Sequence, residues 1–354
     1  MNRTAKSGLW NRGNFYGYRN ENWKPWRMSD ATPVEMGGGL EYDVDDKGRT
    51  WVYPQGDRSA GYSAVMPAGG SFFDQVDHAE PFDMDSVGGD DLTPREDFKD
   101  DFPLASEEDA VYWERESRRL NHETEYAVAG LLGGGGLGDV ASLPGPSVKH
   151  PRGIRRMDSW LAAHLLFPDY IDEVFSLQTE VMLKNLEIYR QAVGERIQVV
   201  WISGTDFGTQ HGTFLSPGIF RKLYKPHYKV INDWVHAHTG WKTFYHSCGA
   251  VYPLMQDFVE MGVDILNPLQ LSADGMDPVK IKAEFGDSIT FWGGGVDTQK
   301  TLPFGTPDQV RLQVRERIGI LNQGGGYVFN PVHNVVANVP PQNLIAMYKA
   351  ALLG

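Results

Sequence analysis

The segment Thr243-Phe244-Tyr245-His246-Ser247-Cys248-Gly249 is the feature around which the pattern of the chain is arranged. Apolar and aromatic residues lead into a His-x-Cys pair that a glycine closes, which is typical of a strand and the turn after it. Side chains on a strand alternate between its two faces, so His246 and Cys248 point the same way. Imidazole and thiolate are both zinc ligands. The segment therefore predicts half of a zinc site, and Cys248 is the only cysteine in the chain.

Helix and strand signals alternate on both sides of this segment. Besides the strand that ends at His246, strands are predicted at 125–132, 197–203, 263–268, 288–293 and 327–330. Helices are predicted at 107–124, 168–194, 216–240 with a kink at Pro226, 250–261, 277–285, 306–322 and 341–352. Six strands that alternate with helices predict an α/β fold with a parallel sheet.

The choice between a closed barrel and an open sheet depends on the glycines after the first predicted strand. Gly133-x-Gly135-x-x-Gly138 formally matches a dinucleotide fingerprint, but prolines at 144, 146 and 151 follow where that motif needs a helix. Without a convincing phosphate loop, we favour a (β/α)8 TIM barrel, a fold that needs eight strands. The first two strands would then be lacking, or replaced by residues 1–90.

The N-terminal part of the chain differs from the rest. We expect an irregular segment with hairpins over residues 1–105 and the barrel over 106–354. Asp45-Asp46-Lys47-Gly48-Arg49 predicts a turn between two short strands. Between Asp74 and Asp109 fourteen residues are acidic and two are basic. We interpret this stretch as a solvated surface, because it lacks the regular spacing of a calcium loop.

Composition excludes several classes of protein. The chain has 354 residues and a formal net charge of -13, which argues against nucleic acid as a partner. No apolar run is long enough to cross a membrane, and no signal-peptide core follows the N-terminus. A single cysteine cannot form an intrachain disulfide, so we expect a cytoplasmic protein.

Polar residues gather just after the predicted strands. They are Asp206, His246, Asn267, Asp297 and His333. In a closed barrel all of these positions face one rim, which is where active sites form. Some residues of these loops also have purely structural interpretations. Asp206 can be a turn aspartate, Asn267 and Gln270 can hold a loop, and Gly293 to Gly295 can form a tight loop.

Several of these segments together resemble the uroporphyrinogen decarboxylase superfamily. They are His246-Ser-Cys248-Gly, Asp264-Ile-Leu-Asn267-Pro, Phe291-Trp292-Gly-Gly-Gly-Val-Asp297-Thr-Gln299 and Asn330-Pro-Val-His333-Asn334. The branch most similar is that of the methyltransferase-like members, and the likeness runs through most of residues 120–352. It implies a (β/α)8 barrel whose site lies at the C-terminal ends of the strands.

The resemblance also implies roles for particular residues. In the methyltransferases a His-x-Cys pair and a later cysteine bind zinc, and that cysteine falls on His333, so the implied ligands are His246, Cys248 and His333. In the decarboxylase, which has no metal there, a histidine in an Asn-x-x-His context contacts the substrate, so His333 fits that role too. Asp206 and His333 are the implied catalytic residues. The implied substrate contacts are Gln210, Asn267, Gln270, Trp292, Asp297, Gln299 and Asn334.

The function that we expect is a zinc-dependent methyl transfer. Zinc would act as a Lewis acid, either on an acceptor thiol or on the oxygen of a methoxy donor. Both versions need a corrinoid, and the Asp-x-His-x-x-Gly signature of corrinoid-binding domains is absent from the chain, which implies a separate corrinoid protein. The alternatives are a metal-free decarboxylase acting on uroporphyrinogen or a related acid, and a ligand-binding barrel without chemistry.

Overall fold

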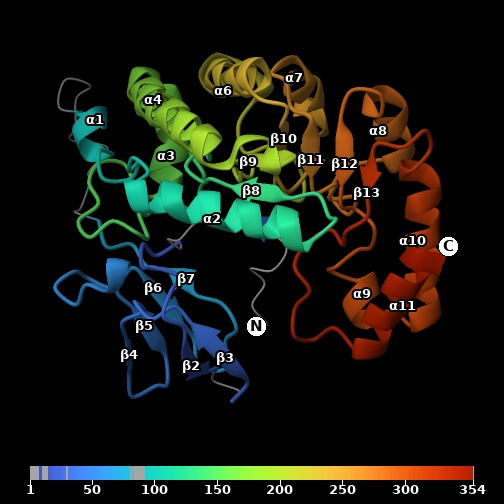
Figure 1. The fold of residues 1–354 in the computed structure, drawn as a ribbon, viewed down its shortest axis with the longest axis horizontal. Coiled ribbons are helices and arrows are strands. Elements are labelled where there is room, and N and C mark those ends of the chain that lie inside the picture. The colour runs from blue at the N-terminus through green and yellow to red at the C-terminus, as the bar shows by residue number, and fades with distance from the viewer. Residues whose placement is uncertain (1–7, 10–14, 29–30, 80–81, 83–91, 354) are drawn as a thin grey trace. The chain divides into compact units, whose positions relative to one another are not determined.

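The computed structural model describes residues 8–9, 15–28, 31–79, 82 and 92–353. These residues form two compact units (Figure 1): unit 1 is Met1–Ile202 with Trp234–Trp241, and unit 2 is Ser203–Asp233 with Lys242–Gly354. The predicted boundary at residue 105 falls inside unit 1 and stays a prediction. The N-terminal seven residues lie outside the described residues, and so do 80–81 and 83–91 of the acidic stretch.

Unit 1 contains parallel strands in the order β1 (Gly8–Leu9), β8 (Ala129–Leu131) and β9 (Val199–Ser203). Ser203, the last residue of β9, belongs to unit 2. Leu9 pairs with Gly130, and Gly130 pairs with Val200. The sequence predicts β8 and β9 but not β1. The N-terminal segment therefore supplies one parallel strand beside β8, whereas the prediction left two strands to be replaced.

The helices of unit 1 pack around one long helix, α4 (Pro168–Val193). They are α1 (Pro94–Asp97), α2 (Glu107–Glu123) and α3 (Met157–Leu166). All three contact α4, and Figure 1 shows α1 and α3 grouped at one end of it. Helix α2 begins where the sequence predicts, because Ser106 and Asp109 form a reciprocal capping box. Buried aromatic rings, among them Trp160 and Phe175, fill the space between α3 and α4.

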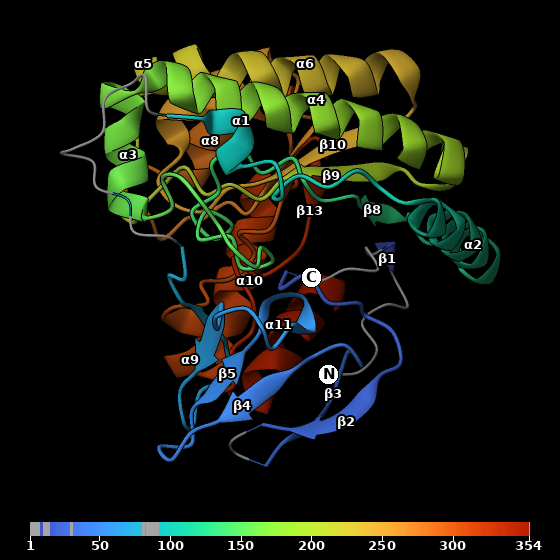
Figure 2. The same cartoon turned by 90° about the vertical axis from the view of Figure 1, so that its left-hand side faces the viewer.

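Two small antiparallel sheets complete unit 1 (Figure 2). One pairs β2 (Lys24–Arg27) with β3 (Pro33–Met36), and the other has the order β4 (Tyr42–Val44), β5 (Thr50–Val52), β6 (Ala64–Met66), β7 (Asp74–Gln75). The predicted hairpin is confirmed as β4 and β5. Its turn closes because the Asp45 carboxylate accepts hydrogen bonds from the backbone N–H groups of Lys47 and Arg49.

Unit 2 contains the remaining parallel strands, in the order β10 (Lys242–His246), β11 (Ile265–Asn267), β12 (Thr290–Trp292), β13 (Tyr327–Val328). Its helices are α5 (Pro217–Ile219), α6 (Lys225–His238, which ends in unit 1), α7 (Met255–Glu260), α8 (Pro278–Phe285), α9 (Thr301–Phe304), α10 (Pro307–Leu321) and α11 (Pro341–Leu353). Parallel strands that alternate with helices give the α/β fold of the TIM-barrel class that the sequence predicts.

The predicted kink at Pro226 takes the form of a π-helical turn. Residues Phe220–Tyr224 have π-helical hydrogen bonds between α5 and α6. Pro226 has no backbone N–H, so the ordinary helical bond to the carbonyl four residues earlier cannot form. The wider π-turn just before it is one way in which a helix accommodates such a break.

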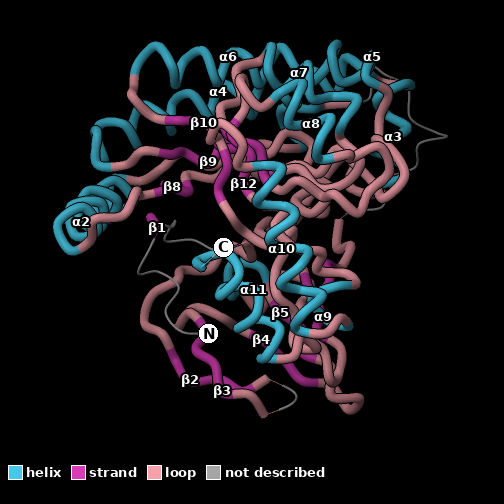
Figure 3. The backbone as a smooth tube through the Cα atoms, turned by 90° about the vertical axis from the view of Figure 1, so that its right-hand side faces the viewer, coloured by secondary structure: helices cyan, strands magenta, loops and turns pink. Residues whose placement is uncertain are grey.

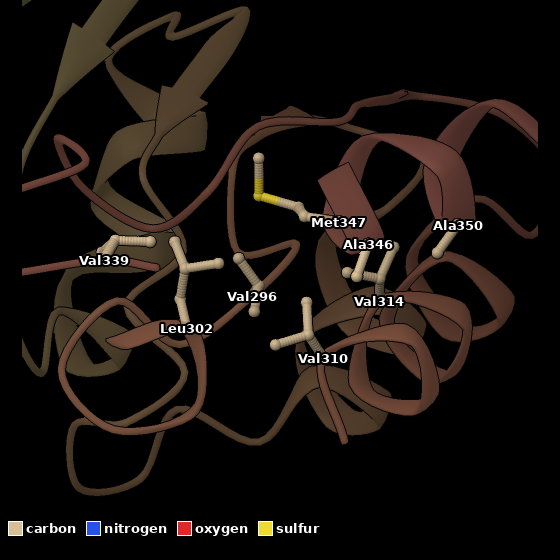
Figure 4. Close-up of a cluster of buried hydrophobic side chains, with 8 residues drawn as sticks. All are labelled: Val296, Leu302, Val310, Val314, Val339, Ala346, Met347 and Ala350. Carbon is tan, nitrogen blue, oxygen red and sulfur yellow. The ribbon is translucent and has the colours of Figure 1, made fainter. Parts of the chain in front are cut away.

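The end of unit 2 is held by packing between α10 and α11, which lie side by side in Figure 3. Their contact is a buried apolar cluster, shown in Figure 4. Its members are Val296, Leu302, Val310, Val314, Val339, Ala346, Met347 and Ala350. The cluster includes Val296 of the loop after β12, so packing at the helices also fixes the chain that leaves that strand.

Within the described part of the chain, no helix combines the length and the apolar character that a membrane span requires.

Candidate metal centre

Two loops of unit 2 meet at the ends of β9 and β10. A Cβ atom added at Gly249, whose φ is +92°, would lie 2.2 Å from the carbonyl carbon of Gly208. Only glycine permits this approach, because it has no Cβ and tolerates positive φ. Three hydrogen bonds join the loops: Phe207 N–H to Ser247 Oγ at 2.9 Å, Ala250 N–H to the Thr209 carbonyl at 2.8 Å, and Cys248 N–H to Asp206 Oδ1 at 2.6 Å.

The junction brings three potential ligand atoms together. One atom each of Asp206, His246 and Cys248 lies within 4.8 Å of the other two. Nε2 of His246 is 3.4 Å from Sγ of Cys248 and 3.6 Å from Oδ1 of Asp206. The predicted same-face placement of His246 and Cys248 is therefore seen, and the third group beside them is Asp206.

Burial and charge at this junction act on the thiol. Burial first, and the neighbouring Asp206 carboxylate second, together raise the pKa of Cys248 to about 12. A thiol with this pKa stays protonated at neutral pH unless a positive charge compensates it. The side chains of Asp206 and His246 remain 37% and 22% exposed, so a small molecule can reach the junction.

The other nitrogen of the His246 ring faces the neighbouring strand. Nδ1 lies 2.7 Å from Oδ1 of Asn267, the residue that pairs with His246 across β10 and β11. The Asn267 amide in turn donates from Nδ2 to the backbone carbonyl of Trp292, at 2.8 Å. Asn267 is buried, with 8% of its surface exposed.

His333 lies close enough to this junction for its charge to matter, but it is not one of the three clustered groups. Desolvation of its ring lowers its pKa, and the positive charge of a protonated His246 lowers it further, whereas Asp206 acts in the opposite direction. The residue is exposed overall. Its predicted role as third zinc ligand stays a prediction, and so does its role as a substrate contact.

Several of the residues predicted to contact a substrate are linked to one another by hydrogen bonds. Gln270 accepts a hydrogen bond from Gly249 N–H at 2.8 Å through Oε1 and donates from Nε2 to Gln210 Oε1 at 3.1 Å. Gln210 Nε2 donates to the Ser272 carbonyl, and the Ser272 hydroxyl donates to Gln299 Oε1 at 3.3 Å. These side chains hold the loops after β9, β10, β11 and β12, which is the loop-holding alternative. Their contact with a substrate stays a prediction.

The remaining predicted contacts are placed separately. Asp297 Oδ1 accepts from the backbone N–H groups of Gln299 and Lys300, as a turn aspartate does. The Trp292 ring packs edge-to-face on Phe244, with centroids 5.4 Å apart. Asn334 is exposed in the loop after β13.

Sequence reasoning did not single out Ser247, Gly208 or the ligand role of Asp206. Ser247 follows His246 in the His-x-Cys pair and points to the opposite side, where its hydroxyl accepts the Phe207 N–H. The signal for Gly208 was its place two residues after Asp206, in a loop that also begins at a strand end. Neither residue type indicates by itself that two loops touch.

Two comparisons with known proteins give similarities. A family model described as uroporphyrinogen decarboxylase (URO-D) matches residues 152–352. A solved structure of a methyltransferase from Methanosarcina mazei is similar, with a TM-score of 0.48 and 17% sequence identity, over 68% of this chain and 63% of that chain. This chain thus spans less than two thirds of the methyltransferase's length. The family model covers more than half of the chain and all of the strand-end residues described above, so the chain belongs to the uroporphyrinogen decarboxylase family.

Proposed function

We propose that this protein is a zinc-dependent methyltransferase that moves a methyl group between a small donor or acceptor and a corrinoid on a separate protein. The observation that carries the proposal is the convergence of Asp206, His246 and Cys248 at the ends of two adjacent strands. The His-x-Cys pair is what the resemblance associates with the methyltransferases and not with the metal-free decarboxylase.

The donor set fits zinc. A carboxylate oxygen, an imidazole nitrogen and a thiolate sulfur are the three kinds of side-chain ligand that zinc accepts. Three protein ligands with a fourth position left for water or substrate is the arrangement of catalytic zinc sites. The partly exposed Asp206 and His246 side chains leave room for that fourth position. We therefore propose Asp206 as the third ligand, with His333 as the rival for that role.

A bound zinc ion would supply Lewis acidity at this junction. Three residues of the chain would have roles beside such an ion. Cys248 would hold the ion as a thiolate, and the positive charge of the ion would compensate the burial that otherwise keeps the thiol protonated. Asp206 keeps its carboxylate in place through the Cys248 N–H. His333, whose lowered pKa keeps its ring neutral near pH 7, can accept a proton from a substrate beside the junction.

Metal analysis of the purified protein is the first test. We expect about one zinc per chain in the wild type and its loss in Cys248→Ala, His246→Ala and Asp206→Ala. His211→Gln is the matched control, since His211 is an exposed histidine whose side chain pairs with Asp274 away from the three clustered groups. His333→Ala decides between the rivals, because zinc retained in this variant assigns the third ligand to Asp206.

Methyl transfer is the second test. Free cobalamin replaces the corrinoid protein: methylcobalamin donates its methyl group to a panel of thiols, and reduced cob(I)alamin accepts one from a panel of methoxy compounds and methylamines. Zinc-dependent change in the cobalamin spectrum with any member of either panel supports the proposal. A metal-free protein that consumes uroporphyrinogen would instead establish the decarboxylase alternative.

A further inference from the structure

Asn267 occupies a position that links three strands of unit 2. It is the last residue of β11, it pairs with the last residue of β10, and its side-chain amide contacts the last residue of β12. Both ends of that amide are used: Oδ1 lies 2.7 Å from Nδ1 of His246, and Nδ2 lies 2.8 Å from the carbonyl oxygen of Trp292. Each polar group of the side chain therefore has a partner within unit 2.

The Trp292 carbonyl determines which way the amide points. A backbone carbonyl can only accept a hydrogen bond, so the amide group that faces it must be the donor Nδ2. The reversed amide would place two oxygen atoms 2.8 Å apart without a hydrogen between them. Asn267 Oδ1 is thereby turned toward His246.

The amide oxygen then determines the tautomer of the imidazole. Oδ1 of an asparagine can only accept, so Nδ1 of His246 must carry the hydrogen that bridges the 2.7 Å contact. In a neutral ring the other nitrogen, Nε2, then carries a lone pair. Nε2 is the atom that lies 3.4 Å from Cys248 Sγ and 3.6 Å from Asp206 Oδ1.

We propose that Asn267 is a positioning residue: it relays the direction of the Trp292 carbonyl to His246 and thereby presents the Nε2 lone pair to the cluster of Asp206 and Cys248. The tautomer follows from the protein alone, whereas its consequence for zinc affinity rests on the proposed function. The predicted contact of Asn267 with a substrate stays a prediction beside this role. The partner that orients a metal-binding histidine is often a carboxylate or a backbone carbonyl, and here a neutral amide transmits the effect of a carbonyl.

The tautomer can be measured without any metal. Nitrogen-15 chemical shifts and long-range proton couplings of a histidine-labelled, metal-free sample distinguish a ring protonated at Nδ1 from one protonated at Nε2, and the His246 signals are identified by their loss in His246→Gln. We expect the Nδ1–H form in the wild type. In Asn267→Leu, which has similar size but no acceptor, we expect a mixture shifted toward Nε2–H. In Asn267→Asp the carboxylate still accepts from Nδ1, so the wild-type tautomer is expected.

Zinc affinity is the second readout. Competition with a chromophoric chelator should show about 10- to 100-fold weaker binding in Asn267→Leu, the range typical for loss of a group that orients a ligand. Asn267→Asp should recover most of that loss, although it cannot donate to Trp292. A purely structural role would predict the opposite order, because a buried carboxylate against a carbonyl oxygen disturbs the fold more than leucine does.

Asn232→Leu is the matched control for the general effect of losing a buried amide. Asn232 is fully buried, donates from Nδ2 to the Met261 carbonyl at 2.7 Å, and accepts from the Tyr245 hydroxyl at 3.0 Å. Its substitution should lower the melting temperature and leave both the His246 tautomer and zinc affinity unchanged.

The outcomes separate the two proposals. An Nε2–H ring in the wild type, or an unchanged ring in Asn267→Leu, overturns the relay. If the tautomer responds as expected and the wild type binds no zinc, the relay stands and the zinc-dependent function fails.

Discussion

The backbone N–H of Cys248 donates to the carboxylate of Asp206 at 2.6 Å, which ties two groups that are 42 positions apart in the sequence. The bond gives Asp206 two roles, as an acceptor that joins two loops and as a proposed zinc ligand. Substitutions at this one position can separate the roles, because an amide keeps the acceptor oxygen and loses the charge.

For Asp206 we therefore compare two variants. Asp206→Asn should stay within about 0.5 kcal/mol of the wild-type free energy of unfolding, whereas Asp206→Ala should lose about 1–2 kcal/mol with the hydrogen bond. Both should weaken zinc binding by more than the 10- to 100-fold typical of residues that merely orient a ligand. Urea unfolding and chelator competition measure the two effects. Full zinc affinity in Asp206→Asn would remove Asp206 from the ligand set.

The affinity for zinc should rise with pH. Burial, then Asp206, raise the pKa of the Cys248 thiol to about 12, so the thiol is protonated throughout the range from pH 6.5 to 8.5. Zinc must displace this proton, and the apparent affinity should increase about tenfold per pH unit. Chelator competition at three pH values measures the slope. Cys248→Ser should lower this slope by an amount that corresponds to about one proton released per zinc bound. An unchanged slope in that variant would show that another group releases the proton.

The close approach of Gly208 and Gly249 makes a sharp prediction for the loops. Gly249→Ala places a Cβ 2.2 Å from the Gly208 carbonyl carbon at a φ of +92°, so it should cost at least about 2 kcal/mol of stability and weaken zinc binding. Gly212→Ala, on the loop that contains Gly208, is the control: its added Cβ meets no atom within 4 Å, and the change should stay within about 0.5 kcal/mol. Thermal and urea unfolding measure the stability of both variants. Equal destabilisation by Gly249→Ala and Gly212→Ala would contradict the steric argument.

The sequence predicts the parallel strands from β8 to β13 because each lies in a run of apolar residues next to a helical period. It does not predict β1, whose two residues, Gly8 and Leu9, are too short for any periodicity to show. That strand exists because its backbone pairs with Ala129 and Gly130, which are about 120 positions away. Pairing over such a distance leaves no local signal.

The candidate site likewise has features that the sequence predicts and features that depend on contacts between distant segments. His246 and Cys248 are predictable because two residues on one strand face share a direction, which is a local property. That Asp206 rather than His333 stands beside them depends on the contact of Gly208 with Gly249, and no pattern in the sequence encodes that contact. Gln210 and Gln270, the predicted substrate contacts, lie in the loops after β9 and β11, and their side-chain amides hydrogen-bond to each other.

His164 gives the protein an acid sensitivity that is independent of the metal centre. The side chain is 3% exposed in α3, lies between the rings of Trp160 and Phe175, and Nδ1 is 2.8 Å from the Trp160 carbonyl. Burial lowers the pKa of His164 from 6.5 to about 4. Between these two values the unfolded chain binds a proton that the folded chain excludes, so stability falls as the pH falls through this window.

The size of the effect follows from the shift. A difference of this size is worth about 3 kcal/mol in full, of which roughly 2 kcal/mol is lost between pH 7 and pH 5. His164→Phe keeps an aromatic ring between Trp160 and Phe175 and removes the titrating group. Urea unfolding at both pH values should therefore show about 2 kcal/mol less acid destabilisation in His164→Phe than in the wild type.

A surface histidine of unit 1 provides the comparison for this experiment. His122→Gln, at an exposed position in α2, should follow the wild-type dependence on pH. Because phenylalanine also changes the packing at this position, the quantity to compare is the change in the free energy of unfolding from pH 7 to pH 5 within each protein. If His164→Phe lost as much stability over that interval as the wild type, the buried ring would have to be protonated in the folded protein, and desolvation in the α3–α4 core would not control its charge.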